Sequence, residues 1–108
     1  MLRPLSSSAV DEHASIEEHR LAWGRAERHL REARNLLDVD EAALGFFIEF
    51  VEHNEQGLAL DELAHAADKV DAPVKFWTLL RKAADEMQLT VADETHGDAV
   101  QIVERHIP

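Results

Sequence analysis

The stretch that decides the fold is residues 73–88, which reads PVKFWTLLRKAADEMQ. Its apolar residues recur at helical spacing and fill an arc of roughly 160° when the segment is drawn at about 100° per residue. Pro73 suits the first turn of a helix, where the N–H that proline lacks has no intrahelical partner. The pattern predicts an amphipathic helix over 73–88. The residues expected in its core-facing arc are Phe76, Trp77, Leu79, Leu80, Ala83, Ala84 and Met87.

A second helix is expected immediately before this stretch, over residues 56–70. Its buried stripe would consist of Leu60, Leu63, Ala67 and Val70. Polar residues, among them Asp61, Glu62, His65 and Asp68, should lie on its outside. The helix should end at Asp71-Ala72-Pro73, with Asp71 as a cap of the next helix.

Residues 40–53 predict a further helix, capped by Asp38 or Asp40. Its apolar residues cover about 200° of a helical wheel, which is wider than one neighbouring helix can bury. We therefore expect this helix to pack against two or more others, or to present part of its arc to a partner. The arc consists of Ala43, Leu44, Phe46, Phe47, Ile48, Phe50 and Val51.

The N-terminal part of the chain predicts a long helix that begins at residue 11 or 15 and ends at 37. Ser15 followed by Glu18 fits a capping box at its start. The apolar stripe would be formed by Ile16, Trp23, Ala26, Leu30, Ala33 and Leu37. Residues 1–10 are expected to form a flexible arm, and residues 11–108 a single helical domain.

The last twenty residues allow two structures. Asp98 and Gln101 could cap a short helix that runs to His106, or β-branched residues could form a small hairpin about His96-Gly97-Asp98. We favour the helix. The predicted fold is all-α: a four-helix bundle-like single domain whose C-terminal tail is a short fifth helix or a small hairpin.

Composition excludes several classes of protein. The 108 residues are 45% hydrophobic and 31% charged, as in a globular domain, and they include no cysteine. The chain therefore has neither disulfides nor a thiolate metal site. No stretch approaches the roughly 20 apolar residues of a membrane span, and the N-terminus lacks the apolar region of a signal peptide. We expect a cytoplasmic protein that binds no membrane.

Negative charge is concentrated in the middle of the chain. Residues 38–71 contain ten acidic residues and one basic residue, Lys69, and so carry nine of the chain's eleven net negative charges. Nucleic-acid binding needs clustered lysine and arginine, and is not expected. Some of the acids serve as helix caps in this interpretation, and the others could attract a basic partner.

The sequence motifs that would indicate enzymatic activity are incomplete or absent. Glu62 and His65 form one E-x-x-H motif, whereas a di-metal bundle uses two such motifs and two further glutamates. There is no G-x-S-x-G nucleophile elbow and no glycine-rich phosphate loop. We predict no catalytic residue, no metal, no cofactor and no enzymatic activity.

Residues 50–63, which read FVEHNEQGLALDEL, resemble a segment of small all-helical bacterial immunity proteins. These are the MafI-type and related antitoxins of polymorphic-toxin and contact-dependent growth-inhibition systems. In them a stretch of the form E-H-x-E-x-x-L-A-L-x-x-L joins two helices. The resemblance covers about residues 40–90.

The resemblance implies a cytoplasmic protein that binds and blocks a cognate toxin domain, often a nuclease. A nuclease active site is basic because it binds phosphates, and a carboxylate surface can occupy it. The expected partner-binding residues are Glu49, Glu52, Glu55, Asp61 and Glu62. The alternative is a non-catalytic helical adaptor or regulatory protein that dimerises through the 11–37 helix.

Overall fold

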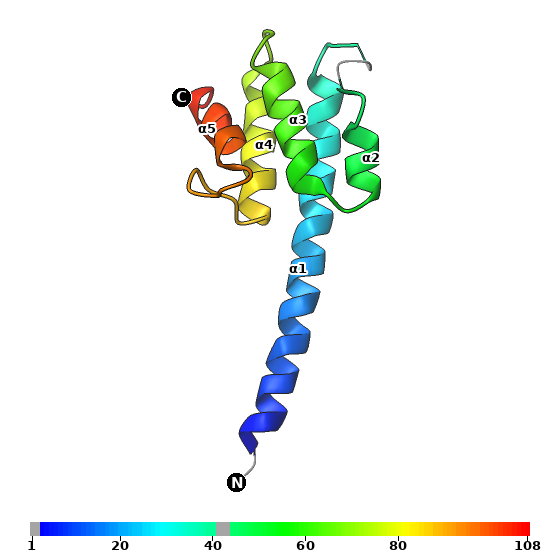
Figure 1. Ribbon diagram of the computed structural model, residues 1–108, viewed down its shortest axis with the longest axis vertical. Helices are drawn as coiled ribbons and strands as arrows, with labels where there is room; N and C mark the ends of the chain where they lie inside the picture. Colours follow the sequence, from blue (N-terminus) through cyan, green and yellow to red (C-terminus); the bar gives the residue numbers. More distant parts are fainter. Residues whose placement is uncertain (1–2, 41–43) are drawn as a thin grey trace.

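The structure of the protein is a computed structural model that describes residues 3–40 and 44–108, the side chains of residues 3–16 excepted. The described chain is all-helical and contains no strand, which confirms the predicted fold class (Figure 1). Its helices are α1 (Arg3–Leu36), α2 (Phe47–Glu52), α3 (Gln56–Ala67), α4 (Val74–Glu86) and α5 (Gly97–Arg105). No described helix combines the length and the apolar character needed to cross a bilayer.

Helix α1 is longer than predicted, and its first half projects beyond the other helices (Figure 1). The predicted start at residue 11 or 15 is wrong, because the backbone is helical from Arg3. Pro4 stands in the first turn, the position that tolerates proline best. The projection gives the molecule a long dimension of 61 Å against 28 and 23 Å for the other two. The flexible arm proposed for residues 1–10 stays a prediction.

The core lies between the second half of α1 and helices α3 and α4. The predicted helices over 56–70 and 73–88 are confirmed as α3 and α4, each a few residues shorter. Phe76 and Trp77 pack edge to face, with ring centroids 5.0 Å apart. Buried core positions that the sequence predicted include Ala26, Leu30, Ala33, Leu37, Leu60, Leu63, Ala67, Phe76, Trp77, Leu79, Leu80, Ala83 and Ala84.

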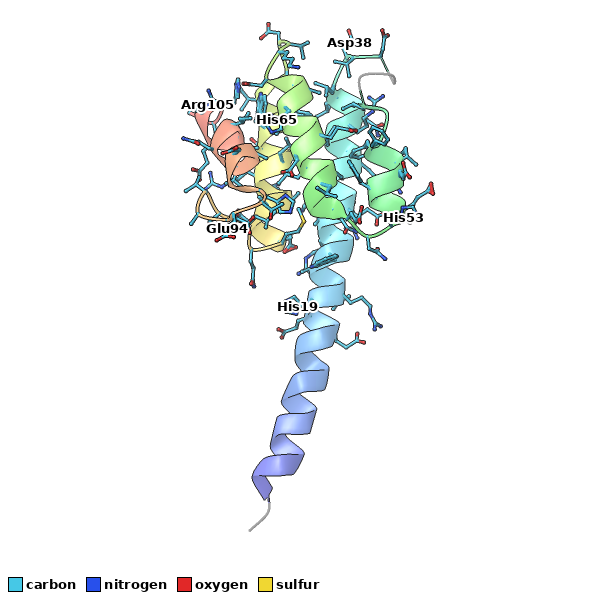
Figure 2. The ribbon with its side chains drawn as sticks, viewed as in Figure 1. His19, Asp38, His53, His65, Glu94 and Arg105 are labelled. Atoms are coloured by element: carbon cyan, nitrogen blue, oxygen red, sulfur yellow. The ribbon has the colours of Figure 1, made fainter. Side chains whose placement is uncertain are left out.

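Two residues of the predicted stripes are exposed. Trp23 is 41% exposed, because it lies on α1 only about one turn after His19, which Figure 2 shows beyond the other helices. Val70 is 43% exposed, because α3 ends at Ala67 and the chain turns away before Val70. A helical wheel assumes that the helix and its neighbours extend along the whole pattern, and here they do not.

Helix α2 has six residues, so the prediction of a helix over 40–53 is wrong at residue 40 and at residues 44–46. Residues 41–43 lie outside the described residues. Leu44 is in a short 3₁₀ turn, and Phe46 precedes α2 with a non-helical ψ of 0°. Neither Asp38 nor Asp40 caps α2, since its N-cap position is Phe46. The turn brings both Leu44 and Phe47 into the core.

The tail forms the short helix α5, so the hairpin alternative is wrong. Its start is fixed by Asp93 and not by Asp98: Asp93 Oδ1 accepts hydrogen bonds from the backbone N–H groups of Thr95, at 2.9 Å, and His96, at 2.7 Å. The same bonds lower the pKa of the Asp93 carboxyl. Asp71 caps no helix either, because Pro73 holds the N-cap position of α4.

Candidate functional site

The outward side of α2 combines two acidic residues with exposed apolar side chains. Glu49 and Glu52 are exposed and point away from Phe47 and Val51, which are buried. We call this surface the α2 face. On a wheel of about 100° per residue its two acids lie between aromatic residues on one side and an aliphatic residue on the other. The apolar members are Phe46, which is 60% exposed, Phe50, which is partly buried, and Ile48, which is 52% exposed.

The aromatic edge of the α2 face is ordered by contact between its two rings. The ring centroids of Phe46 and Phe50 lie 6.0 Å apart with the planes tilted by 34°. On the opposite edge, Ile48 borders a surface hollow of about 460 Å³ between residues 44–48 and the end of α1, where Arg34 and Asn35 line it. The α2 face therefore offers both protruding apolar groups and a recess.

Glu55 extends the acidic surface to the connection between α2 and α3. It is exposed and holds the N-cap position of α3. The preceding residue, Asn54, has a positive φ of 57°, which asparagine adopts more readily than most residues. Among the ion pairs of the described residues, none involves Glu49, Glu52 or Glu55. Their charges are therefore not neutralised by any side chain in the described part of the chain.

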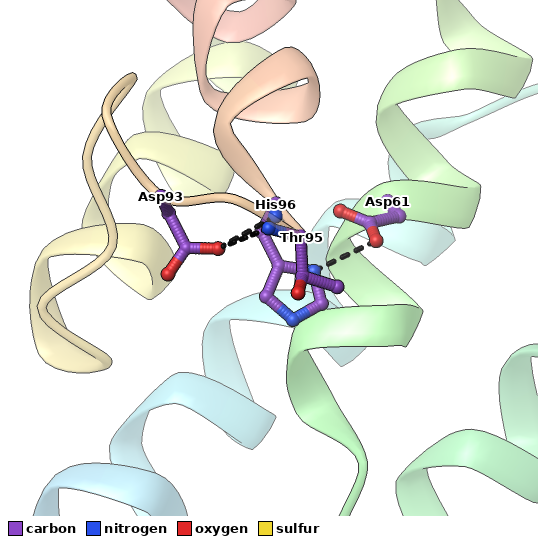
Figure 3. Close-up of polar contacts among 4 residues, drawn as sticks. All are labelled: Asp61, Asp93, Thr95 and His96. Carbon is purple, nitrogen blue, oxygen red and sulfur yellow. Dashed lines mark hydrogen bonds and ion pairs between the residues drawn. The ribbon is translucent and has the colours of Figure 1, made fainter.

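Asp61 does not belong to this surface, although the sequence placed it there. It is partly buried, and its Oδ2 accepts a hydrogen bond of 2.7 Å from Nδ1–H of His96, which precedes α5 (Figure 3). Burial raises the pKa of Asp61, and the bond from His96 offsets only part of that rise. The residue fastens the start of α5 to α3.

Glu62 also faces inward, towards the start of α2. Backbone N–H groups of Phe46 and Phe47 interact with its carboxylate and lower its pKa, but burial raises that pKa by more. The first N–H groups of a helix have no partner in the helix itself, so a carboxylate there is stabilising. The Glu62 carboxylate thus lies beside the start of α2, where the sequence placed Asp38 or Asp40, and its Oε1 is buried without a hydrogen-bond partner among the described residues. The five predicted binding residues divide into three surface acids and two that hold helices together.

A second histidine–aspartate pair fastens the other end of α5. Nε2–H of His106 donates to Asp68 Oδ1 at 3.0 Å, and the His106 ring stacks on Trp77 with centroids 4.0 Å apart. The bond from His106, with help from the nearby Arg105, lowers the pKa of Asp68. Asp61 and Asp68 are seven residues apart, about two helical turns, and so share one side of α3.

Sequence reasoning missed both pairs. The seven-residue spacing of Asp61 and Asp68 is visible in the sequence, as are the two histidines that flank residues 97–105. What the sequence could not show is that α5 folds back onto this side of α3 (Figure 1). That packing turns two apparently exposed acids into helix-docking groups.

The E-x-x-H motif does not form a site. Glu62 faces the start of α2, and His65 is exposed (Figure 2). Within the part of the chain that the structure describes, no three histidine, aspartate or glutamate side chains are grouped as metal ligands. The arrangement that remains is a surface suited to contact with another molecule. The chain matches no protein-family model, no curated protein and no solved structure.

Proposed function

We propose that this chain is an immunity protein that binds a basic, nuclease-type toxin domain in the cytoplasm and blocks it. The observation that carries the proposal is the α2 face: unpaired carboxylates between exposed apolar side chains. Buried aromatic anchors supply most of the energy of protein interfaces, and opposite charges raise the rate of association. The face has both kinds of group within two turns of helix.

The partner contacts in this proposal are made by Glu49, Glu52 and Glu55, which carry three negative charges on one exposed edge. Asp61 and Glu62 act indirectly, since they position α5 and α2. The segment that resembles the immunity proteins, residues 50–63, contains the end of α2, the connection and the first two thirds of α3. It therefore includes two of the three proposed contact residues.

The proposal also includes the arrangement of the helices as a four-helix bundle-like domain. In a four-helix bundle-like domain, α1, α3 and α4 would be the three long packed helices and α2 a short fourth. In that arrangement α2 places Phe47 and Val51 in the core and Phe50 partly against it, which leaves Phe46 and Ile48 for a partner.

A second candidate is a non-catalytic adaptor that dimerises through α1. The observation in its favour is that α1 projects from the other helices and carries Leu21, 59% exposed, and Trp23. An isolated helix is marginally stable in water, so a projecting one gains from a partner. Light scattering distinguishes the two candidates: a dimeric adaptor has twice the mass of the chain with nothing else present.

The immunity proposal has a direct genetic test. The reading frame next to this gene is expressed alone and growth is scored. We expect growth arrest, and recovery when this chain is co-expressed. A harmless neighbour, or arrest that co-expression does not relieve, would refute the proposal.

A further inference from the structure

A hollow in the surface beside Trp23 has features of a binding site. Its volume is about 510 Å³, enough for a large side chain. It lies between α1, which supplies His19, Arg20, Trp23, Gly24 and Glu27, and the start of α3 with the connection before it, which supply Gln56 and Asn54. Glu55 lies between these last two residues in the chain, so the hollow adjoins the acidic surface.

Gly24 leaves the α1 wall of the hollow open. Glycine inside a helix is less stable than alanine by about 1 kcal/mol. Neither packing nor backbone conformation calls for it here: a Cβ at Gly24 would meet nothing within 4 Å, and its φ is not positive. The absence of a side chain lets a ligand approach the helix backbone beside the indole of Trp23.

Gln56 supplies a hydrogen-bonding group without a partner. The residue is 2% exposed, and its Oε1 is buried with no hydrogen-bond donor in the described part of the chain. A buried amide oxygen without a donor is unfavourable by about 1–3 kcal/mol, so it favours a ligand that brings an N–H group.

The charge around the hollow favours a cation. Arg20, which lines the hollow, is paired with Glu17 at 3.3 Å, and Glu27, which also lines it, is paired with Arg31 at 3.0 Å. The charges within each pair cancel, and Glu55 on the adjoining connection adds a negative charge that no described residue pairs. An indole face attracts a cation that lies over it, most strongly when the cation is partly desolvated.

We propose that this hollow binds one lysine or arginine side chain of the partner, with the cationic group over the Trp23 ring and an N–H directed to Gln56 Oε1. The inference rests on the proposed function, since it assumes a basic protein partner. It adds an anchor site at a distance from the α2 face. The partner would then contact the α2 face, the connection and α1 together.

The test uses a peptide of six arginines with the full chain, followed by NMR. The indole N–H of Trp23 and the side-chain amide of Gln56 should shift saturably, while the indole of Trp77, 2% exposed, should not. A peptide of six citrullines, which has the same shape without charge, should give no shift. A peptide of six lysines should shift the same signals. Shifts with both peptides indicate a general cation site, and shifts with the arginine peptide alone indicate a site specific for guanidinium.

Two variants and a control test the site. Trp23→Ala should raise the Kd of the arginine peptide about threefold to thirtyfold, the range expected for loss of a cation–π contact. Gly24→Leu should fill the hollow and weaken binding at least as much, while its helix preference is improved. Leu21→Ala, a comparably exposed residue of α1 outside this hollow, should leave the Kd within twofold.

The outcomes separate this inference from the proposed function. If the peptide shifts only the signals of Glu49, Glu52 and Glu55, the hollow is not a site and the acidic surface stands. If the arginine peptide binds nowhere on the chain, both the cation site at the hollow and the proposed acidic contact surface are overturned. If citrulline binds as well as arginine, the hollow does not select a cation.

Discussion

Gly57 is the position where one added methyl group should have the most informative effect on stability. It is the second residue of α3, and its φ is negative, so alanine fits the backbone. A Cβ there would lie 2.6 Å from Nε2 and 2.9 Å from Cε1 of His96. Ordinary contacts begin near 3.4 Å, so the imidazole must move by nearly an ångström.

That movement should break the hydrogen bond to Asp61. The bond is 2.7 Å long, and a displacement of this size takes it past the limit of about 3.2 Å for a normal hydrogen bond. Loss of a hydrogen bond to a carboxylate destabilises a protein by about 1.5–3 kcal/mol. Alanine gains up to about 1 kcal/mol over glycine in a helix. The free energy of unfolding of Gly57→Ala should therefore fall by roughly 0.5–2 kcal/mol.

The effect of Gly57→Ala on the free energy of unfolding should change sign when the His96 imidazole is absent. In a His96→Ala background nothing obstructs the new methyl group, and Gly57→Ala should stabilise the protein by up to about 1 kcal/mol. The four proteins of this double-mutant cycle are the wild type, the two single variants and the double variant. Their free energies of unfolding are measured by urea unfolding, followed by circular dichroism at 222 nm. If Gly57→Ala is destabilising by the same amount in both backgrounds, contact with His96 is not the cause and the reasoning fails.

Three further predictions concern stability. Gly97→Ala should destabilise the protein by about 1–3 kcal/mol, because its Cβ would lie 2.5 Å from the backbone carbonyl oxygen of Val91, which cannot move aside as a side chain can. Gly24→Ala should raise the urea midpoint, by up to about 1 kcal/mol of unfolding free energy, and a lower midpoint would show a packing role for the glycine. The lowered pKa of Asp68 means that its bond from His106 stabilises the fold above the unfolded pKa of about 3.9, and that this contribution is lost as pH falls through the lower, folded value. The stability difference between wild type and Asp68→Asn should therefore be full at pH 6 and shrink below pH 4, and a constant difference would contradict the assignment.

The helical periodicity of the sequence was enough to predict α3, α4 and the buried half of α1. Those segments have apolar stripes at helical spacing, and the stripe itself determines which side packs. For α5 the sequence left a hairpin open, because Val100, Ile102 and Val103 suit either structure. All three are in fact buried on the inner side of the short helix.

The candidate site was less predictable, because exposure depends on which helices meet. A wheel of α3 alone places Asp61 and Glu62 outside, yet α5 and the start of α2 cover them. For the same reason the exposure of Trp23 could not be predicted, and the sequence pattern assigns this residue to a buried stripe. We also expected part of the apolar arc of residues 40–53 to face a partner, and Phe46 and Ile48 are exposed, although the helix covers only 47–52.

The central claim is that the acids of the α2 face attract a basic partner protein, and the rate of association tests it most directly. The partner is the product of the neighbouring reading frame, and association is measured by stopped flow in low salt and in 0.5 M salt. Glu49→Lys/Glu52→Lys is compared with Glu94→Lys/Glu104→Lys, which makes the same change of charge at exposed positions outside the face; Figure 2 shows Glu94 on the opposite side of the molecule from α2. We expect the first variant to associate at least tenfold more slowly than the control in low salt, and the difference to shrink in high salt as charges are screened. Equal rates for the two variants would contradict the claim.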